Sequence, residues 1–142
     1  MSPAATGLTV GTPAGPVTVP ARVGFVEPLP GLPGHTAYTL DQLDEIGFLF
    51  ALRADGGAGV RLFVVSPALV FPGYDPRIPR SALDLVCGPG AEPAYALLAV
   101  VHPGDGLAPT VDLLAPIVVD TASGRALQTV LDEDLPLRAP LG

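Results

Sequence analysis

The stretch EIGFLFALRADGGAGVRLFVV, residues 45–65, decides the fold. Residues 45–52 and 60–65 are rich in aliphatic and aromatic side chains, which is typical of strands, and they flank the glycine-rich segment 54–59. Glycine readily adopts the positive φ angles that hairpin turns require. The stretch therefore predicts two antiparallel strands joined as a hairpin.

Shorter strand-like runs lie on both sides of this hairpin, at residues 17–19, 23–26, 95–101, 115–119 and 126–131. Ser81–Val86 predicts a short helix with Ser81 as its N-cap, which the Gly-Pro-Gly sequence at 88–90 must end. Ile117 lies in a nearly continuous apolar run and is expected in the core. Roughly six to eight short strands separated by turns predict an all-β, mainly antiparallel fold, a small β-barrel with one or two short helices.

The chain is long enough to fold as one domain. Of its 142 residues, 49% are hydrophobic and only 15% are charged, so burial of apolar surface can offset the entropy lost on folding. Residues 1–16 are rich in Gly, Pro, Ala and Thr without periodicity, and within them Leu8–Val10 is the segment most like a strand. We therefore expect a flexible N-terminal arm over residues 1–16 and a single domain over residues 17–142.

The charge balance limits the partners that the chain can have. Seven arginines, no lysine and 14 acidic residues give a net charge of −7. No window concentrates basic residues, so direct binding to nucleic acid is not expected, whereas a basic protein partner would suit the charge. The longest apolar run, Ala94–Val101, is too short for a membrane span, and the N-terminus lacks the features of a secretory signal. A cytoplasmic protein without membrane association is expected.

No motif in the sequence points to catalysis or to a cofactor. His35 and His102 lack further ligands at the spacing of metal sites. Cys87 and Ser66 lack the local signatures of nucleophiles, and Cys87 has no partner for an internal disulfide. We therefore expect neither an enzyme nor a bound cofactor.

Four segments follow one another in a distinctive order over residues 17–141. They are GLPG at 31–34; LFVVSP at 62–67 with FPGY at 71–74; DLLAPIVVD at 112–120; and RALQ at 125–128 with LRAPL at 137–141. Together they resemble the bacterial flagellar assembly factor FliW family, whose usual pattern is G-[LI]-P-G-F, F-x-V-x-N-P with F-P-x-Y, T-x-N-L-x-A-P-I-V-x-N, and R-x-A-x-Q with R-x-P-L. The third segment is the most specific, because few apolar strands carry an internal proline between two polar ends. This chain departs from the pattern at His35, Ser66, Asp112 and Asp120.

The resemblance implies a small β-barrel without catalysis that binds the translational regulator CsrA and, alternatively, flagellin. Accumulating flagellin would occupy the protein and free CsrA to repress flagellin synthesis, and export of flagellin would reverse the exchange. CsrA-type proteins are basic because they bind RNA, which fits an acidic partner, and we expect this chain to be a monomer. Two alternatives stay open: a flagellin-binding export chaperone without a role towards CsrA, and a small split-barrel ligand-binding protein.

The residues themselves nominate contacts with a protein partner. Pro116 cannot donate to a β-ladder, so it marks a bulge or an edge where another chain could pair. The proline-stiffened loop 71–76 could present aromatic anchors, although Phe71 could also plug the barrel end. Asp112 and Asp120 could either cap turns or contact a partner. The acidic run 132–134 could either form a solvated turn or contact a basic partner. The candidates are Phe71, Tyr74, Asp75, Asp112, Pro116, Asp120, Asp132, Glu133 and Asp134.

Overall fold

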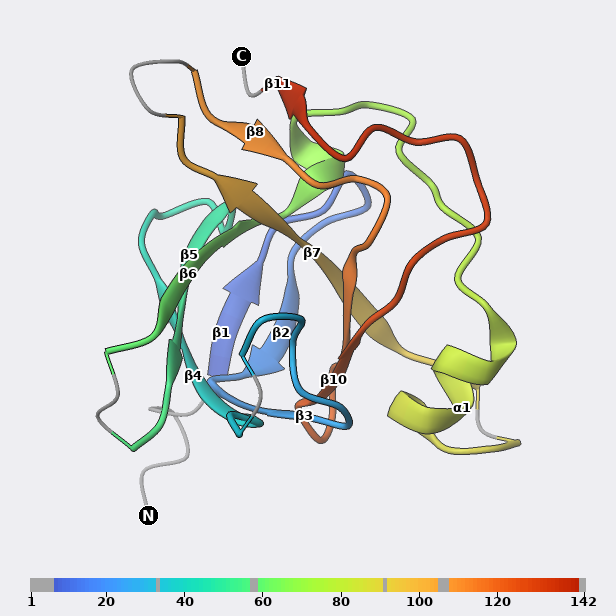
Figure 1. Cartoon of the computed structure of the whole chain (residues 1–142). Helices are drawn as coiled ribbons and strands as arrows, with labels where there is room; N and C mark the ends of the chain where they lie inside the picture. Colours follow the sequence, from blue (N-terminus) through green and yellow to red (C-terminus); the bar gives the residue numbers. More distant parts are fainter. Residues whose placement is uncertain (1–6, 33, 57–58, 91, 105–107, 141–142) are drawn as a thin grey trace.

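The computed structural model describes residues 7–32, 34–56, 59–90, 92–104 and 108–140. Short strands predominate along the chain (Figure 1). The elements are β1 (Gly7–Val10), β2 (Val17–Pro20), β3 (Arg22–Phe25), β4 (Ala37–Gln42), β5 (Leu49–Ala54), β6 (Arg61–Val65), the 3₁₀ turn η2 (Pro67–Leu69), α1 (Arg80–Cys87), β7 (Tyr95–His102), β8 (Thr110–Val111), β9 (Ile117–Asp120), β10 (Arg125–Gln128) and β11 (Ala139–Pro140).

Seven of the described strands close into a barrel. Their order around the ring is β7, β6, β5, β4, β3, β10 and β9, and β9 pairs again with β7. Neighbours in the ring are antiparallel except β3 and β10, which run parallel, with Gly24 N donating to Gly124 O at 3.0 Å. β8 pairs with the last two residues of β7, and β11 pairs with β8. The expected all-β, mainly antiparallel barrel is confirmed.

The hairpin expected in residues 45–65 joins β5 to β6, with a ladder that runs from Leu49 opposite Val65 to Arg53 opposite Arg61. Gly56 and Gly59 of its turn have positive φ, whereas residues 57 and 58 lie outside the described part of the chain. The sequence therefore identified both the hairpin and the glycines that its turn requires.

The first strand of this hairpin begins at Leu49, four residues later than expected. Gly47 has a φ of +77°, and its carbonyl accepts a hydrogen bond from Gly11 N at 2.8 Å. A Cβ at Gly47 would collide with the backbone of Thr9 and Gly11. Contact with the distant residues Thr9 and Gly11 thus fixes a turn at Gly47, and β5 begins only after it.

Thr9 and Gly11 lie in the β1–β2 hairpin, which belongs to the folded domain. Val10 and Val19 are 0% and 1% exposed and form part of the barrel core. The short strand expected at Leu8–Val10 is present within β1. The expectation of a flexible arm needs correction from Gly7 onward, because burial of these valines holds the hairpin on the barrel; residues 1–6 lie outside the described residues.

Alternate side chains of the strands fill the barrel, and Ile117 is among them at 1% exposed, as expected. Phe25 and Tyr38 meet edge to face with ring centroids 5.2 Å apart. The other large buried side chains of this core are Leu40, Phe50, Leu52, Val64 and Leu98. The barrel is therefore a packed core rather than a channel.

Helix α1 covers the outer face of β9 and β10, where its Ala82 and Val86 pack against Val118 and Leu127. The N-cap is Pro79 rather than the expected Ser81, and no side chain caps the helix. The fixed φ of proline suits the start of a helix, so the helix begins directly after it. In the described part of the chain, no helix is long and apolar enough to cross a membrane.

The closure of the barrel at Gly124 can be tested by substitution. Gly124 and Gly59 have nearly equal φ values of +78° and +76°, but only at Gly124 would an added Cβ collide with a backbone atom, the carbonyl oxygen of Arg22. We expect Gly59→Ala to lower the free energy of unfolding by about 1 kcal/mol through backbone strain alone. Gly124→Ala should lower it clearly more in urea unfolding. Equal losses of unfolding free energy in the two variants would show that the close approach of Gly124 to Arg22 does not constrain closure of the barrel.

Candidate functional site

The proline-stiffened loop 71–76 is held against the protein by its aromatic residues. Phe71 and Tyr74 are half-buried and pack beside Val111 and Leu113. The Tyr74 hydroxyl donates to the carbonyl oxygen of Leu113 at 2.8 Å. Burial raises the pKa of Tyr74 above its ordinary value, and the carboxylates of Asp112 and Glu133 raise it further. Tyr74, nominated as a partner contact, is thus a structural anchor of this loop.

Asp112 and Asp120 cap turns at the two ends of the segment that contains β9. One oxygen of Asp112, Oδ1, accepts the backbone N–H groups of Leu114 and Ala115 at 3.1 and 3.0 Å. Asp120 Oδ2 accepts the backbone N–H and the hydroxyl of Ser123 at 2.8 and 2.6 Å. Turn capping, one of the two roles considered for these acids, is thus present in the structure.

Ionisation of Asp120 is favoured by this environment. Burial alone would raise its pKa, but hydrogen bonds from Ser123, Cys87 and the backbone outweigh burial and hold the pKa below its ordinary value. Burial raises the pKa of the neighbouring Cys87 thiol, and Asp120 raises it further. This environment therefore favours the neutral thiol of Cys87.

Of the bulge and the open edge expected at Pro116, the structure contradicts the open edge. Pro116 is buried, and its carbonyl accepts a hydrogen bond from Thr129 N at 3.1 Å. Leu131 N donates to Leu114 O at 2.9 Å, so residues after β10 continue the ladder alongside residues before β9. The chain itself covers the position where a partner strand was expected.

Three of the nominated acids meet at one place. Asp75 from the loop and Asp132 and Glu133 from the C-terminal segment line a hollow of about 560 Å³, together with Arg77 and Pro79. Glu133 Oε2 accepts the backbone N–H of Arg77 at 2.8 Å across 56 residues of sequence. We call Asp75, Asp132 and Glu133 the acidic hollow; exposed Asp134 follows it directly in the sequence.

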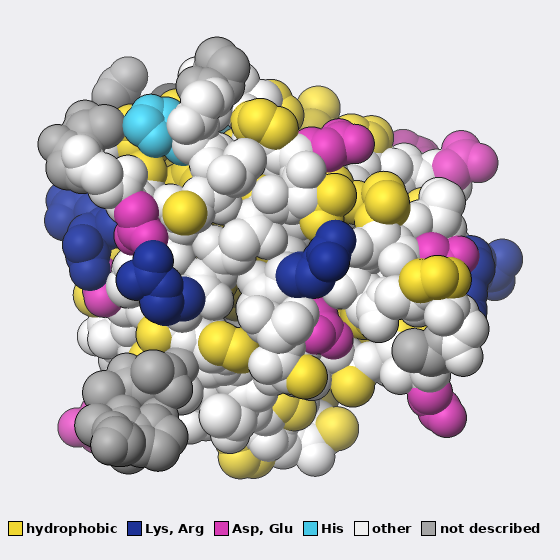
Figure 2. Space-filling view, turned by 90° about the horizontal axis from the view of Figure 1, so that it is seen from below, with side chains coloured by type: hydrophobic (Ala, Val, Ile, Leu, Met, Phe, Trp, Pro, Cys, Tyr) yellow, Lys and Arg dark blue, Asp and Glu magenta, His cyan; other side chains and the backbone are white. Residues whose placement is uncertain are grey.

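The arginines are spread over the surface, and several are paired with carboxylates. Arg22 contacts Asp55 at 2.7 Å, and Arg53 contacts Asp41 at 2.6 Å; a third pair joins Arg80 to Asp84 within α1. Figure 2 shows arginine side chains standing apart from one another, with acidic side chains among them. Three of the seven arginines are thus paired with carboxylates of the described residues.

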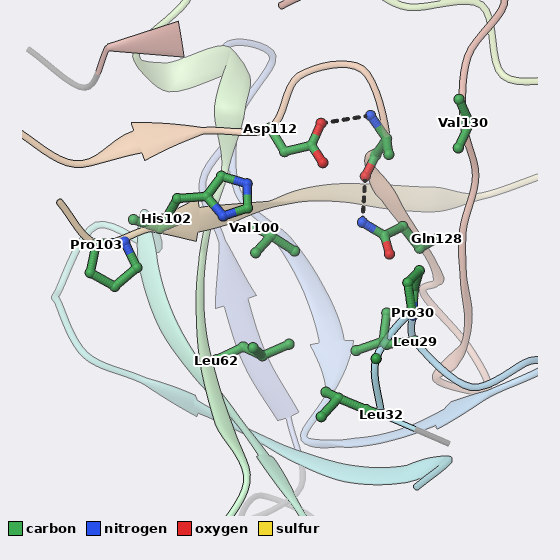
Figure 3. A pocket seen from close by; sticks show the side chains of 13 residues that line it. Leu29, Pro30, Leu32, Leu62, Val100, His102, Pro103, Asp112, Gln128 and Val130 are labelled. Atoms are coloured by element: carbon green, nitrogen blue, oxygen red, sulfur yellow. Dashed lines mark hydrogen bonds between the residues drawn. The ribbon is translucent and has the colours of Figure 1, made fainter. Parts of the chain in front are cut away.

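The structure also contains a groove that sequence reasoning missed, at one end of the barrel. β10 runs parallel to β3, so the C-terminus of β10 lies beside the β3–β4 loop at this end of the barrel. The start of β6 and the C-terminus of β7 lie at the same end. We call the groove the barrel mouth; it measures about 530 Å³ (Figure 3). Its lining residues are Leu29, Pro30, Gly31, Leu32, Leu62, Val100, Val101, His102, Pro103, Asp112, Ala115, Gln128 and Val130.

Two polar side chains hold one wall of the barrel mouth. Asp112 accepts from Ala115 N, and Gln128 Nε2 donates to Ala115 O at 3.1 Å. Leu29 and Leu32, which also line the mouth, belong to the stretch PLPGLPG at 28–34 in the loop between β3 and β4. Two leucines within this proline- and glycine-rich turn were the signal that could have indicated an apolar surface.

The family model described as FliW protein matches residues 13–141. The chain belongs to the FliW family. The resemblance in the four sequence segments is thereby confirmed.

Relatives in the family carry the name flagellar assembly factor FliW. The Thermotoga maritima protein is 36% identical over 98 residues, which cover 66% of this chain and 62% of that protein's length. The Thermotoga neapolitana protein is 30% identical over 112 residues, covering 76% and 73%, and the Bacillus velezensis protein is 27% identical over 113 residues, covering 78% of each. The chain thus matches somewhat less than two thirds of the Thermotoga maritima protein.

The fold is similar to that of a solved FliW structure. A crystal structure of the flagellar assembly factor FliW superposes with a TM-score of 0.75 and covers 95% of this chain and 97% of that one. Sequence identity between the two is 20%, so this likeness concerns the fold.

The anchoring role of Tyr74 predicts a stability effect that depends on pH. Tyr74→Phe removes the hydrogen bond to Leu113 O, and we expect a loss of about 1 kcal/mol at neutral pH. Because the pKa of Tyr74 is raised in the folded state, its stabilising contribution is complete below about pH 10, the ordinary tyrosine pKa, and declines above it. The difference between wild type and variant in urea unfolding should therefore shrink above that pH. A constant difference would contradict the anchoring role of the buried phenol.

Proposed function

We propose that this chain is a flagellar assembly factor that acts by binding rather than by catalysis. In this proposal it binds a basic CsrA-type translational regulator and relieves repression of flagellin synthesis, and flagellin competes as the second partner. Membership of the FliW family supports the assembly role, and the names of its relatives agree with it.

The observation that best supports a basic partner is the acidic hollow. Asp75, Asp132 and Glu133 come together from two distant segments, and Glu133 is held in place by the backbone of Arg77. Three acids elsewhere, Asp41, Asp55 and Asp84, are engaged in ion pairs. The hollow is therefore a place where negative charge is concentrated and open to a basic surface.

A direct titration tests this proposal. We expect isothermal titration to detect binding of both a CsrA-type regulator and flagellin from the same organism, and each partner to reduce the binding of the other. Binding of flagellin alone would favour the export chaperone, and absence of binding to either partner at micromolar concentration would contradict the proposal.

The acidic hollow predicts how the regulator's binding kinetics depend on charge. Asp132→Lys with Asp134→Lys should slow association far more than it speeds dissociation, and most at low salt, where the Debye length is about 30 Å at 0.01 M. Glu133 stays unchanged because it holds Arg77 N.

Glu27→Lys with Glu45→Lys is the matched control for stopped-flow measurements. These two acids are exposed, and the change in net charge is the same, but neither lines the acidic hollow. If both double variants slow association equally, net charge rather than the hollow directs the encounter.

A further inference from the structure

We propose that the barrel mouth binds a short segment of a partner protein in which aliphatic side chains flank an arginine or lysine. The apolar side chains would lie on the leucines and valines of the mouth, and the cation would reach the carboxylate of Asp112. This site goes beyond the proposed function, because the barrel mouth and the acidic hollow share no lining residue.

Apolar residues open to solvent form one part of this site. Leu32, Leu62 and Val100 pack against the barrel core but are only partly buried. Val130, at the rim, is 71% exposed. Figure 3 shows Leu32, Leu62 and Val100 around one cavity, with Val130 at its border. Its volume of about 530 Å³ lies within the range of protein ligand pockets, on the order of 300–1,000 Å³.

Unused hydrogen-bond acceptors form the other part. Asp112 is 7% exposed, and both of its hydrogen bonds from described residues go to Oδ1. Oδ2 accepts none from the described residues and faces the barrel mouth in Figure 3. Oδ2 is therefore open to a donor supplied by a partner, and a cationic donor would form a charge-assisted hydrogen bond there.

The polar lining favours a cation. Gln128 donates its Nε2 to Ala115 O, which leaves Oε1 as a second acceptor in the same wall. No lysine or arginine is among the described residues that line the mouth. Two acceptors beside an apolar floor suit the guanidinium or ammonium group of a residue whose neighbours are aliphatic.

Capped model peptides test this specificity. The probe is acetyl-GLVRLG-amide; acetyl-GLVELG-amide reverses its charge, and acetyl-GSSRSG-amide removes its apolar side chains. Binding is followed by two-dimensional NMR of the isotope-labelled full chain. We expect the first peptide to shift the backbone resonances of Val100, Gln128 and Val130, with an affinity about tenfold or more above that of the other two. Absence of these shifts, or equal binding of the glutamate peptide, would overturn the proposal.

Two variants with matched controls separate the contributions. Asp112→Asn keeps an oxygen for the backbone N–H groups of Leu114 and Ala115 but removes the charge; it should weaken the arginine peptide about tenfold. Glu45→Gln removes a charge at an exposed position outside the mouth and should leave affinity unchanged. If Asp112→Asn and Glu45→Gln weaken binding of the arginine peptide equally, the peptide is attracted by net charge and the proposal is overturned.

The apolar part has its own pair of variants. Val130→Ser should weaken the peptide, whereas Ile46→Ser, at a residue 68% exposed outside the mouth, should not. Because Val130 is 71% exposed, this variant should fold even if Asp112→Asn does not. Equal affinity of the two serine variants would overturn the apolar contact.

Sedimentation of the full chain distinguishes a second copy from a foreign segment. A monomer at all concentrations supports the proposal, and a dimer that Val130→Ser dissociates would overturn it by making a second copy the occupant. Titration with the regulator is independent: peptide binding without regulator binding would count against the proposed function alone.

Discussion

The parallel pairing of β3 with β10 is the constraint on which the rest of the structure depends. It closes the ring, and it requires Gly124, with its positive φ, to bring its backbone against Arg22. Because β10 runs in the same direction as β3, its C-terminal end lies beside the β3–β4 loop. The barrel mouth exists only through this pairing, since Gln128 and Val130 would otherwise lie far from Leu29 and Leu32.

The acidic residues of this chain have different structural roles: some cap turns and others form ion pairs. Asp112 and Asp120 accept backbone N–H groups at turns, and Asp41 is paired with Arg53, whose hydrogen bond lowers the pKa of Asp41. The net charge of −7 is therefore a poor guide to where a basic partner would be attracted. Among the described residues, the acids of the acidic hollow are exposed and lie close together.

Local interactions explain which predictions from the sequence were confirmed. The β5–β6 hairpin depends on neighbouring residues, so its glycine turn and the two flanking runs of aliphatic and aromatic residues were sufficient to identify it. The late start of β5 at Leu49 and the burial of Pro116 depend on Gly11 and Thr129, which lie far away in the sequence. No local pattern contains such contacts, and the expectations for Glu45 and Pro116 differed from the structure for that reason.

By itself, the sequence determined the β-rich fold class, the principal hairpin, the core position of Ile117, the acidic character and the family pattern. These properties follow from composition, from side-chain periodicity and from motifs that are contiguous in the chain. Only the tertiary structure decided that Tyr74 anchors its loop, that Asp75 meets Glu133, and that an apolar mouth opens beside Asp112. The physical reason is that strand register and barrel closure bring together residues that the chain separates, and no stretch of sequence specifies that closure alone.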